Sequence, residues 1–259
     1  MLAYVGEGTR AQGRKLVQLT GLICAVVLGV FSPSNWRRTI RIALARNLVS
    51  SGVEAIGIVC VLAIALGVLL VVQYQLWLQH LLHSRFLGSI LDAVVVRELA
   101  PLLVNLVVIA RSGSAMTAEL ALVHVAGEDR IVEGLGLDPL AYFVLPRTVG
   151  LIISTACLTL IFIAVSFLSV YIGGQWLGVR TDFLDFTRDT LRALSPADLV
   201  NLGIKSTLPA LLAGCICCAE GLGAGDSNAE VPRACRIGVQ RSVIALFIVT
   251  ALVSVLAYL

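Results

Sequence analysis

The sequence predicts an all-α integral membrane protein, and three observations support this fold class. Hydrophobic residues make up 58% of the 259 residues and charged residues only 14%, whereas a soluble domain carries about 25% charged residues. Several apolar runs are long enough for a helix to cross the ~30 Å hydrocarbon core of a bilayer. These runs lack the strict alternation of apolar and polar residues that is typical of an outer-membrane barrel strand. The spans are therefore expected to be helices.

The N-terminal apolar run, residues 16–31, is too short for a comfortable membrane span. At ~1.5 Å per residue, its helix would fall short of the ~30 Å hydrocarbon core. Basic residues flank the run on both sides, and Trp36, Arg37 and Arg38 follow it as an interface anchor. We therefore predict a helix that lies in the interface of the inner leaflet. The alternative, a short true span, would reverse the orientation of every later helix.

Five later apolar runs predict transmembrane helices within a single domain, residues 1–259. The first run ends in polar and aromatic residues typical of a membrane interface, the third is long enough to tilt, and the fifth is apolar to its last residue. The second and the fourth are unusual because they carry charged residues in their interiors. The five predicted spans are residues 53–78, 87–110, 149–177, 199–219 and 242–259.

Three charged residues are the strongest candidates for a functional site inside the membrane. Arg97 and Glu98 lie in the second predicted span, and Lys205 lies in the fourth. Each such charge costs about 2.5–3.5 kcal/mol on insertion scales, so it normally faces a cavity or a partner. Pro101 and Pro209 each stand four residues after one of the two basic residues and cannot donate an N–H to its carbonyl. We therefore expect two kinked helices that line a shared polar cavity.

A polar segment, residues 115–139, separates the second and third predicted spans. It contains several acidic residues and is interrupted by glycines. Basic residues concentrate in the N-terminal region, around this segment and before the last span. The positive-inside rule therefore places the N-terminus and the 115–139 segment in the cytoplasm. A net charge of only +3 gives no reason to expect a nucleic-acid partner.

The sequence contains no recognised catalytic or metal-binding motif. A P-loop requires G-x-x-x-x-G-K-[ST], whereas Gly203-Ile204-Lys205-Ser206 has the wrong spacing and lies inside a predicted span. The cysteine cluster at 215–218 lacks a second ligand cluster, and His80 and His83 fall at a membrane edge beside Trp77. We therefore expect no enzyme activity, no cofactor and no metal ion, and the chain cannot be its own ATPase.

Three motifs resemble the signature region of the MlaE (YrbE) family, which comprises permease subunits of bacterial lipid-transport ABC systems. They are R-E-L-A-P at 97–101, A-R-S-G-S-A-M-T-A-E-L at 110–120 and G-L-D-P-L-A-Y-F-V-L-P-R at 136–147. The resemblance covers nearly the whole chain. It implies a permease homodimer in the bacterial inner membrane, a cytoplasmic ABC ATPase, a STAS-domain regulator and a periplasmic hexamer of MCE domains. The implied function is movement of phospholipid or a related lipid between that membrane and the periplasmic carrier, which maintains outer-membrane lipid asymmetry.

The same resemblance implies roles for individual residues. Arg97, Glu98 and Lys205 would line the lipid cavity at the dimer interface, and Glu119 to Glu133 would form a coupling helix against the ATPase. The residues implied in coupling are Glu119, Glu128, Glu133 and Asp138. One departure falls in this helix, because the family commonly has Thr-Glu-Gln where this chain has Ala126-Gly127-Glu128.

Two alternatives remain open at this point. The three intramembrane charges could brace helices against one another instead of binding lipid, since such charges often pair structurally. The chain could also act alone, as a secondary transporter or channel for an amphiphilic solute. That second function would require repeated halves or a dense polar pathway, and the sequence shows neither.

Overall fold

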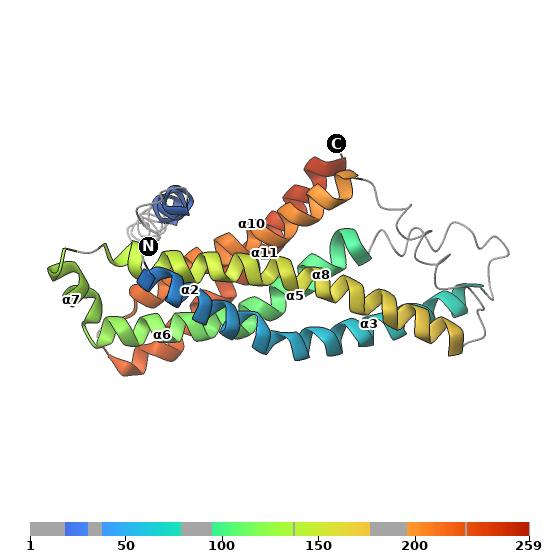
Figure 1. Cartoon of the computed structure of the whole chain (residues 1–259), viewed down its shortest axis with the longest axis horizontal. Coiled ribbons are helices and arrows are strands. Elements are labelled where there is room, and N and C mark those ends of the chain that lie inside the picture. The colour runs from blue at the N-terminus through green and yellow to red at the C-terminus, as the bar shows by residue number, and fades with distance from the viewer. Residues whose placement is uncertain are drawn as a thin grey trace, which may run out of the picture.

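The computed structural model describes residues 19–30, 38–78, 95–136, 138–176, 196–225 and 227–258 (Figure 1). Within these ranges the regular structure is helical and contains no strand. In the described part of the chain, five helices are long and apolar enough to cross a membrane, and a shorter apolar helix covers Leu19–Val30. The all-α membrane fold with five spans is therefore confirmed. The candidate spans are Ile40–Gln73, Val96–Val125, Tyr142–Trp176, Pro196–Leu222 and Asn228–Ala257.

The first span starts earlier than residue 53. Helix α2 (Arg38–Ser51) leads through a short 3-10 turn, η2 (Val53–Ala55), into α3 (Ile56–Leu78). The junction lies at Gly52, where a Cβ would come within 2.6 Å of the Leu48 carbonyl oxygen and 3.1 Å of Ser154 Oγ. The predicted start at residue 53 followed the beginning of the uncharged apolar run, but the helical structure also includes arginines that precede this run.

The second span and the first part of the polar segment form one continuous rod, residues 95–125. It consists of the π-helix η3 (Val95–Leu99), α5 (Ala100–Val108), the π-helix η4 (Ile109–Gly113) and α6 (Ser114–Val125). The irregularity that Pro101 predicts takes the form of the π-helical turn immediately before α5. The helix continues without interruption from the predicted span, which ends at residue 110, into the polar segment, and we call these helices the α5–α6 rod. Residues 87–94 of the predicted span lie outside the described residues.

The last three spans are also longer than their apolar runs. Helix α8 (Leu145–Trp176) follows the π-helix η5 (Leu140–Val144), and α10 covers Pro196–Leu222. After a short link and the 3-10 turn η6 (Asn228–Glu230), α11 covers Val231–Tyr258. Arg233, Arg236 and Arg241, which precede the last predicted span, therefore lie in α11, and Arg241 pairs there with Glu220 of α10. The stretch between the fourth and fifth predicted spans is therefore mostly helix.

Helix α10 is the most buried span, because it packs against α11, α8, α6 and α5. Small residues allow these close contacts. A Cβ on Gly214 would meet Thr148 Cγ2 at 2.9 Å, and one on Gly221 would meet Leu120 Cβ at 2.8 Å. Figure 1 shows α10 and α11 side by side, diverging from α3 and α8 toward the end opposite α7. The start of the α5–α6 rod contacts both of these pairs.

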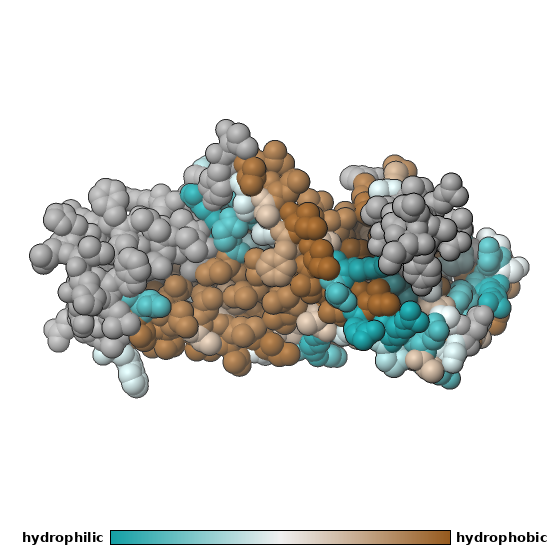
Figure 2. All heavy atoms as spheres, turned by 180° about the vertical axis from the view of Figure 1, so that it is seen from behind, coloured by the Kyte–Doolittle hydropathy of each residue, from teal (hydrophilic) through white to brown (hydrophobic). Residues whose placement is uncertain are grey.

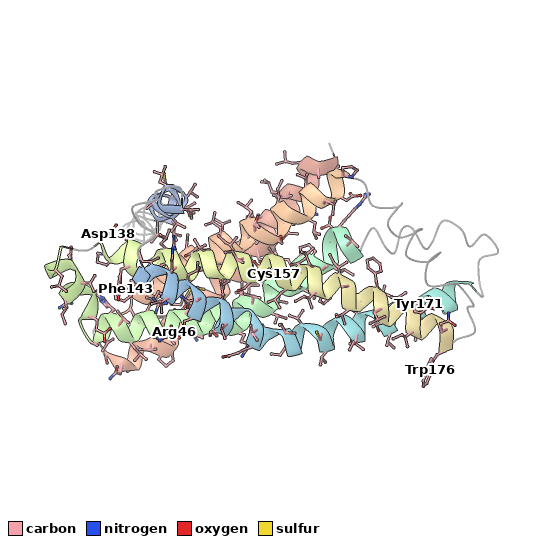
Figure 3. The ribbon with its side chains drawn as sticks, viewed as in Figure 1. Arg46, Asp138, Phe143, Cys157, Tyr171 and Trp176 are labelled. Carbon is pink, nitrogen blue, oxygen red and sulfur yellow. The ribbon has the colours of Figure 1, made fainter. Side chains whose placement is uncertain are left out.

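The surface has the distribution expected of a membrane protein. Figure 2 shows apolar side chains across the middle of one face, with hydrophilic side chains gathered at the α7 end. Helix α7 (Glu128–Gly134) has no buried residue. Figure 3 places Asp138 near this end and Tyr171 and Trp176 toward the opposite end of α8. The long axis of the helices therefore runs from a polar end across an apolar belt.

Candidate functional site

Four charged side chains pair between η3 and α10. Arg97 Nε lies 2.7 Å from Asp198 Oδ1, and its Nη2 donates to Asp198 Oδ2 at 2.8 Å. Lys205 Nζ donates to Glu98 Oε1 at 2.5 Å. Because Arg97 and Glu98 are consecutive, they point in different directions around their helix, and each meets its own partner. We call Arg97, Glu98, Asp198 and Lys205 the charged cluster.

The ammonium group of Lys205 is fully enclosed at the centre of the charged cluster. Its side chain is 0% exposed, whereas the side chain of Glu98 is 34% exposed. Lys205 Nζ also lies 3.2 Å from the carbonyl oxygen of Arg97. Pro101 has no N–H to donate to this carbonyl in an α-helical hydrogen bond. The contact between a basic side chain and a carbonyl freed by proline therefore forms between helices. The sequence predicted the freed carbonyl but could not identify its partner.

Helix α11 also contributes to the charged cluster. Ser254 Oγ lies 3.1 Å from each carboxylate oxygen of Glu98, and also donates to the carbonyl of Thr250 at 2.8 Å. One carboxylate therefore connects three helical segments: η3, α10 and α11. Ser254 was not predicted, because a single serine in an apolar run gives no distinctive signal.

Asp198 is the clearest residue that the sequence analysis missed. It stands just before the fourth predicted span, residues 199–219, but it lies in the first turn of α10 with a side chain only 9% exposed. A signal was available, because Asp198 precedes Lys205 by seven residues, or two helical turns, and so shares its face. Starting the predicted helix one turn earlier would have placed Asp198 on the same face as Lys205, although not beside Arg97.

The charged cluster opens to its surroundings on one side. The side chains of Arg97 and Glu98 are 28% and 34% exposed, while those of Asp198 and Lys205 are 9% and 0% exposed. An arriving polar group can therefore reach the guanidinium and carboxylate of η3 first. Asp198 and Lys205, the two residues on α10, form ion pairs with these groups from the buried side.

An apolar groove lies elsewhere, between α3 and α8, and has a volume of about 480 Å³. None of the charged cluster lines it. Ser169, which lines this groove, donates its hydroxyl to the carbonyl of Ile64 at 3.0 Å, and the rest of the lining is almost entirely aliphatic. The groove and the charged cluster are separate features of the surface.

The residues implied in ATPase coupling are distributed over two helices and a turn instead of one helix. Glu119 lies on α6, where it is 59% exposed and reaches Arg147 Nη2 at 3.4 Å. Gly127 has a φ of 73° and separates α6 from α7, because this left-handed conformation ends the first helix. Glu128 and Glu133 lie on α7 and are exposed. Asp138 is exposed too, and its Oδ1 accepts the backbone N–H of Leu140 at 3.0 Å.

A side-chain pair fixes α7 to the end of α6. His124 Nδ1 lies 2.6 Å from Asp129 Oδ2, and the backbone N–H of Arg130 donates to Asp129 Oδ1 at 2.9 Å. Burial is the largest single influence on the pKa of Asp129 and raises it. The hydrogen bonds and the charges of His124 and Arg130 together leave this pKa below its ordinary value of 3.8. Asp129 is therefore held as a carboxylate.

Cysteines in α10 fill packing positions. Cys215, Cys217 and Cys218 are buried thiols, and Cys217 Sγ lies 3.4 Å from Ser242 Oγ of α11. Over the part of the chain that the structure describes, no group of three or more His, Cys, Asp or Glu side chains is placed to hold a metal ion. His80 and His83 lie outside the described residues.

Comparisons with known proteins identify the family of this chain. The family model described as permease MlaE matches residues 44–256. A probable ABC transporter permease protein of Rickettsia prowazekii is 26% identical over 215 residues, 82% of this chain and 82% of that protein. The intermembrane phospholipid transport system permease protein MlaE of Haemophilus influenzae is 30% identical over 129 residues, 49% of each chain. The chloroplastic protein TRIGALACTOSYLDIACYLGLYCEROL 1 of Arabidopsis thaliana is 26% identical over 215 residues, 83% of this chain and 59% of that protein.

The match to the family model includes all four residues of the charged cluster, the whole α5–α6 rod and α7. Together with the five candidate spans, it shows that this multi-pass membrane protein belongs to the MlaE permease family.

Proposed function

We propose that this chain is the permease subunit of an ABC transporter that moves phospholipid, or a related lipid, between the bacterial inner membrane and a periplasmic carrier. The single observation that carries the proposal is the charged cluster within membrane-spanning helices, with Arg97 and Glu98 partly exposed. Intramembrane charges are costly and usually mark a substrate path or a partner contact. The name of the Haemophilus influenzae relative, which specifies phospholipid transport, supports the same class of substrate.

The charges suggest how a lipid head group is held. A guanidinium binds phosphate through two parallel hydrogen bonds, so Arg97 is the residue best suited to a phospholipid head group. In this structure Asp198 occupies that guanidinium. A phosphate would therefore replace Asp198 at Arg97, while acyl chains lie along the apolar walls of the spans. Lys205 stabilises Glu98 from behind and does not need to contact the lipid itself.

The bracing role and the lipid-binding role are compatible in this proposal. In the described conformation both ion pairs join η3 to α10, which is the bracing interpretation of these charges. Opening of one pair would release Arg97 for a lipid and loosen the contact between the helices. The same charges thus hold η3 against α10 in the described conformation.

The energy source in this proposal is a separate cytoplasmic ABC ATPase. The ATPase would contact α7, with its exposed Glu128 and Glu133, and a STAS-domain regulator would bind the ATPase. A second copy of the permease and a periplasmic hexamer of MCE domains complete the assembly, which would maintain outer-membrane lipid asymmetry. The N-terminus and α7 lie on the cytoplasmic side in this arrangement, as the distribution of basic residues favours.

Lipid retention by the purified transporter complex tests the proposal. We expect Arg97→Ala and Lys205→Ala to lower the phospholipid that co-purifies, measured by mass spectrometry, without loss of the ATPase subunit. Arg41→Ala is the matched control, because Arg41 is an exposed arginine of α2 outside the charged cluster. Unchanged lipid content and an unchanged outer-membrane barrier in both cluster variants would refute the proposal.

A further inference from the structure

One buried amide outside the charged cluster connects α5 to α10. Asn105 is 0% exposed in the middle of α5. Its Nδ2 lies 2.8 Å from the carbonyl oxygen of Pro101, 3.3 Å from that of Lys205 and 3.5 Å from that of Ser206. We propose that Asn105 is a positioning residue, which holds Lys205 against Glu98 by binding the backbone carbonyl of Lys205. This inference rests on the proposed function for its link to lipid transport.

The carbonyl of Lys205 needs an outside donor because of Pro209. In an α-helix this carbonyl would accept the N–H of residue 209, but proline has none. A buried carbonyl without a partner is costly, so another donor must satisfy it. Asn105 Nδ2 lies within hydrogen-bond distance of it from the neighbouring helix.

A corresponding contact runs from α10 to the Arg97 carbonyl of η3. Pro101 offers no N–H to the carbonyl of Arg97, and Lys205 Nζ of α10 lies 3.2 Å from that oxygen. Each helix therefore lacks one backbone donor at a proline and receives a side-chain donor from the other. Lys205 takes part in both contacts, through its ammonium in one and its carbonyl in the other. Both contacts fix α10 at the height where Lys205 meets Glu98.

The surroundings of the amide determine its orientation. The three neighbouring acceptors are all carbonyl oxygens, which require the NH₂ group of Asn105 and would repel its oxygen. Asn105 Oδ1 has no hydrogen-bond partner among the described residues. An asparagine retained in an apolar helix with its oxygen unsatisfied is explained by the donors that it supplies, because leucine would fill the same space without this cost.

A suppressor experiment separates hydrogen bonding from packing. In the assembled transporter, Asn105→Leu removes the donors and keeps an apolar side chain of similar size. We expect acylation of Lys205 by an amine-reactive reagent to rise by up to about tenfold, the factor that corresponds to one buried hydrogen bond. Adding Pro209→Ala restores a backbone N–H four residues after Lys205, so the double variant should return to the wild-type level of labelling.

Asn201→Leu provides a matched control on α10, since Asn201 Oδ1 has no partner either. The inference is overturned if Asn105→Leu leaves Lys205 labelling unchanged, if Pro209→Ala fails to restore it, or if Asn201→Leu raises it equally. If Asn105→Leu does not accumulate, recovery of folded protein in the double variant supports the inference, and loss of both variants refutes it.

Phospholipid content of the same samples distinguishes this inference from the proposed function. We expect lipid content to fall in Asn105→Leu and to recover in the double variant. If labelling follows this pattern while Lys205→Ala leaves lipid content unchanged, Asn105 positions Lys205 but the proposed function is wrong. If Lys205→Ala loses lipid and labelling is unaffected by Asn105→Leu, the proposed function stands and the inference fails.

Discussion

Lys205 donates to Glu98 at 2.5 Å, with the lysine side chain fully buried and the carboxylate one-third exposed. A buried ammonium is tolerated only when a countercharge and hydrogen-bond acceptors surround it. Glu98 provides the countercharge, and the carbonyl of Arg97 provides a further acceptor at 3.2 Å. The exposed edge of Glu98 is therefore the point where a change in the surroundings can reach the buried charge.

The first prediction concerns this ion pair. Glu98→Gln leaves the ammonium of Lys205 without its countercharge and should destabilise the permease by about 3 kcal/mol, near the lower end for broken buried pairs. Adding Lys205→Met removes the stranded charge and should restore most of the lost stability. Thermal unfolding of the purified permease provides the measurement.

Glu54→Gln is the control for the ion-pair prediction. Glu54 pairs with Arg111 at 2.8 Å but its side chain is 57% exposed, so its loss should cost no more than about 1 kcal/mol. A double variant no more stable than Glu98→Gln would show that the charge of Lys205 is compensated in another way.

The second prediction concerns the acidic residues proposed to contact the ATPase. Glu128→Lys and Glu133→Lys reverse exposed charges on α7 and should reduce the ATPase that co-purifies with the permease. Glu119→Lys should have a smaller effect, because Glu119 lies on α6 beside Arg147. Normal recovery of the ATPase with both α7 variants would exclude α7 as the coupling element.

The third prediction concerns the packing of α6 against α10. In Gly221→Ala the new Cβ would meet Leu120 Cβ at 2.8 Å and the carbonyl oxygen of Thr117 at 2.9 Å. We expect a loss of about 1–3 kcal/mol in thermal or denaturant unfolding, as for other overpacked interiors. Gly203→Ala on the same helix meets nothing within 4 Å and should be neutral or slightly stabilising. Equal stability of the two variants would contradict the close packing of α6 and α10.

The fourth prediction concerns pH and the pair between His124 and Asp129. Because the pKa of Asp129 is lowered in the folded protein, the carboxylate stabilises α7 at pH values above its ordinary pKa of 3.8. This contribution is lost as the pH falls through the lowered pKa. Asp129→Asn should therefore speed hydrogen exchange in α7 at neutral pH, and the difference from wild type should disappear in acid, after correction for intrinsic exchange rates.

Asp138→Asn is the control for the pH prediction, since Asp138 binds the N–H of Leu140 and does not contact α7 in the same way. An effect of Asp129→Asn that persists unchanged below the pKa of the carboxyl would show that its charge is not responsible.

The sequence was sufficient for the number of spans but not for their ends. Long apolar runs identify the centre of each helix, because the bilayer requires them. Charged residues continue the helices beyond these runs, so α2 and the first turns of α11 fell outside the predicted spans. Asp198 was missed for the same reason, although its spacing from Lys205 placed both residues on one face. The predicted ends were least accurate where a span was ended at the edge of its apolar run.

The charged cluster was predicted in part. The sequence identified Arg97, Glu98 and Lys205 because charged residues inside a membrane are costly and are usually functional or paired. The two prolines indicated which backbone carbonyls would lack an N–H donor. The pairing of these groups depends on the relative height and rotation of α5, α10 and α11, which no local pattern specifies. Asn105 was missed because its role depends on the neighbouring helix, where Pro209 leaves the carbonyl of Lys205 without an N–H donor.

The α5–α6 rod has a geometric consequence for how this protein can vary. It carries Arg97 and Glu98 near one end and reaches α7 at the other, through 31 consecutive helical residues. Inserting one residue between these ends would rotate one relative to the other by about 100° and lengthen the rod by about 1.5 Å. The charges would then turn away from α10 while α7 kept its place, or the reverse. We expect natural insertions to occur in the short link between α10 and α11 and not within this rod.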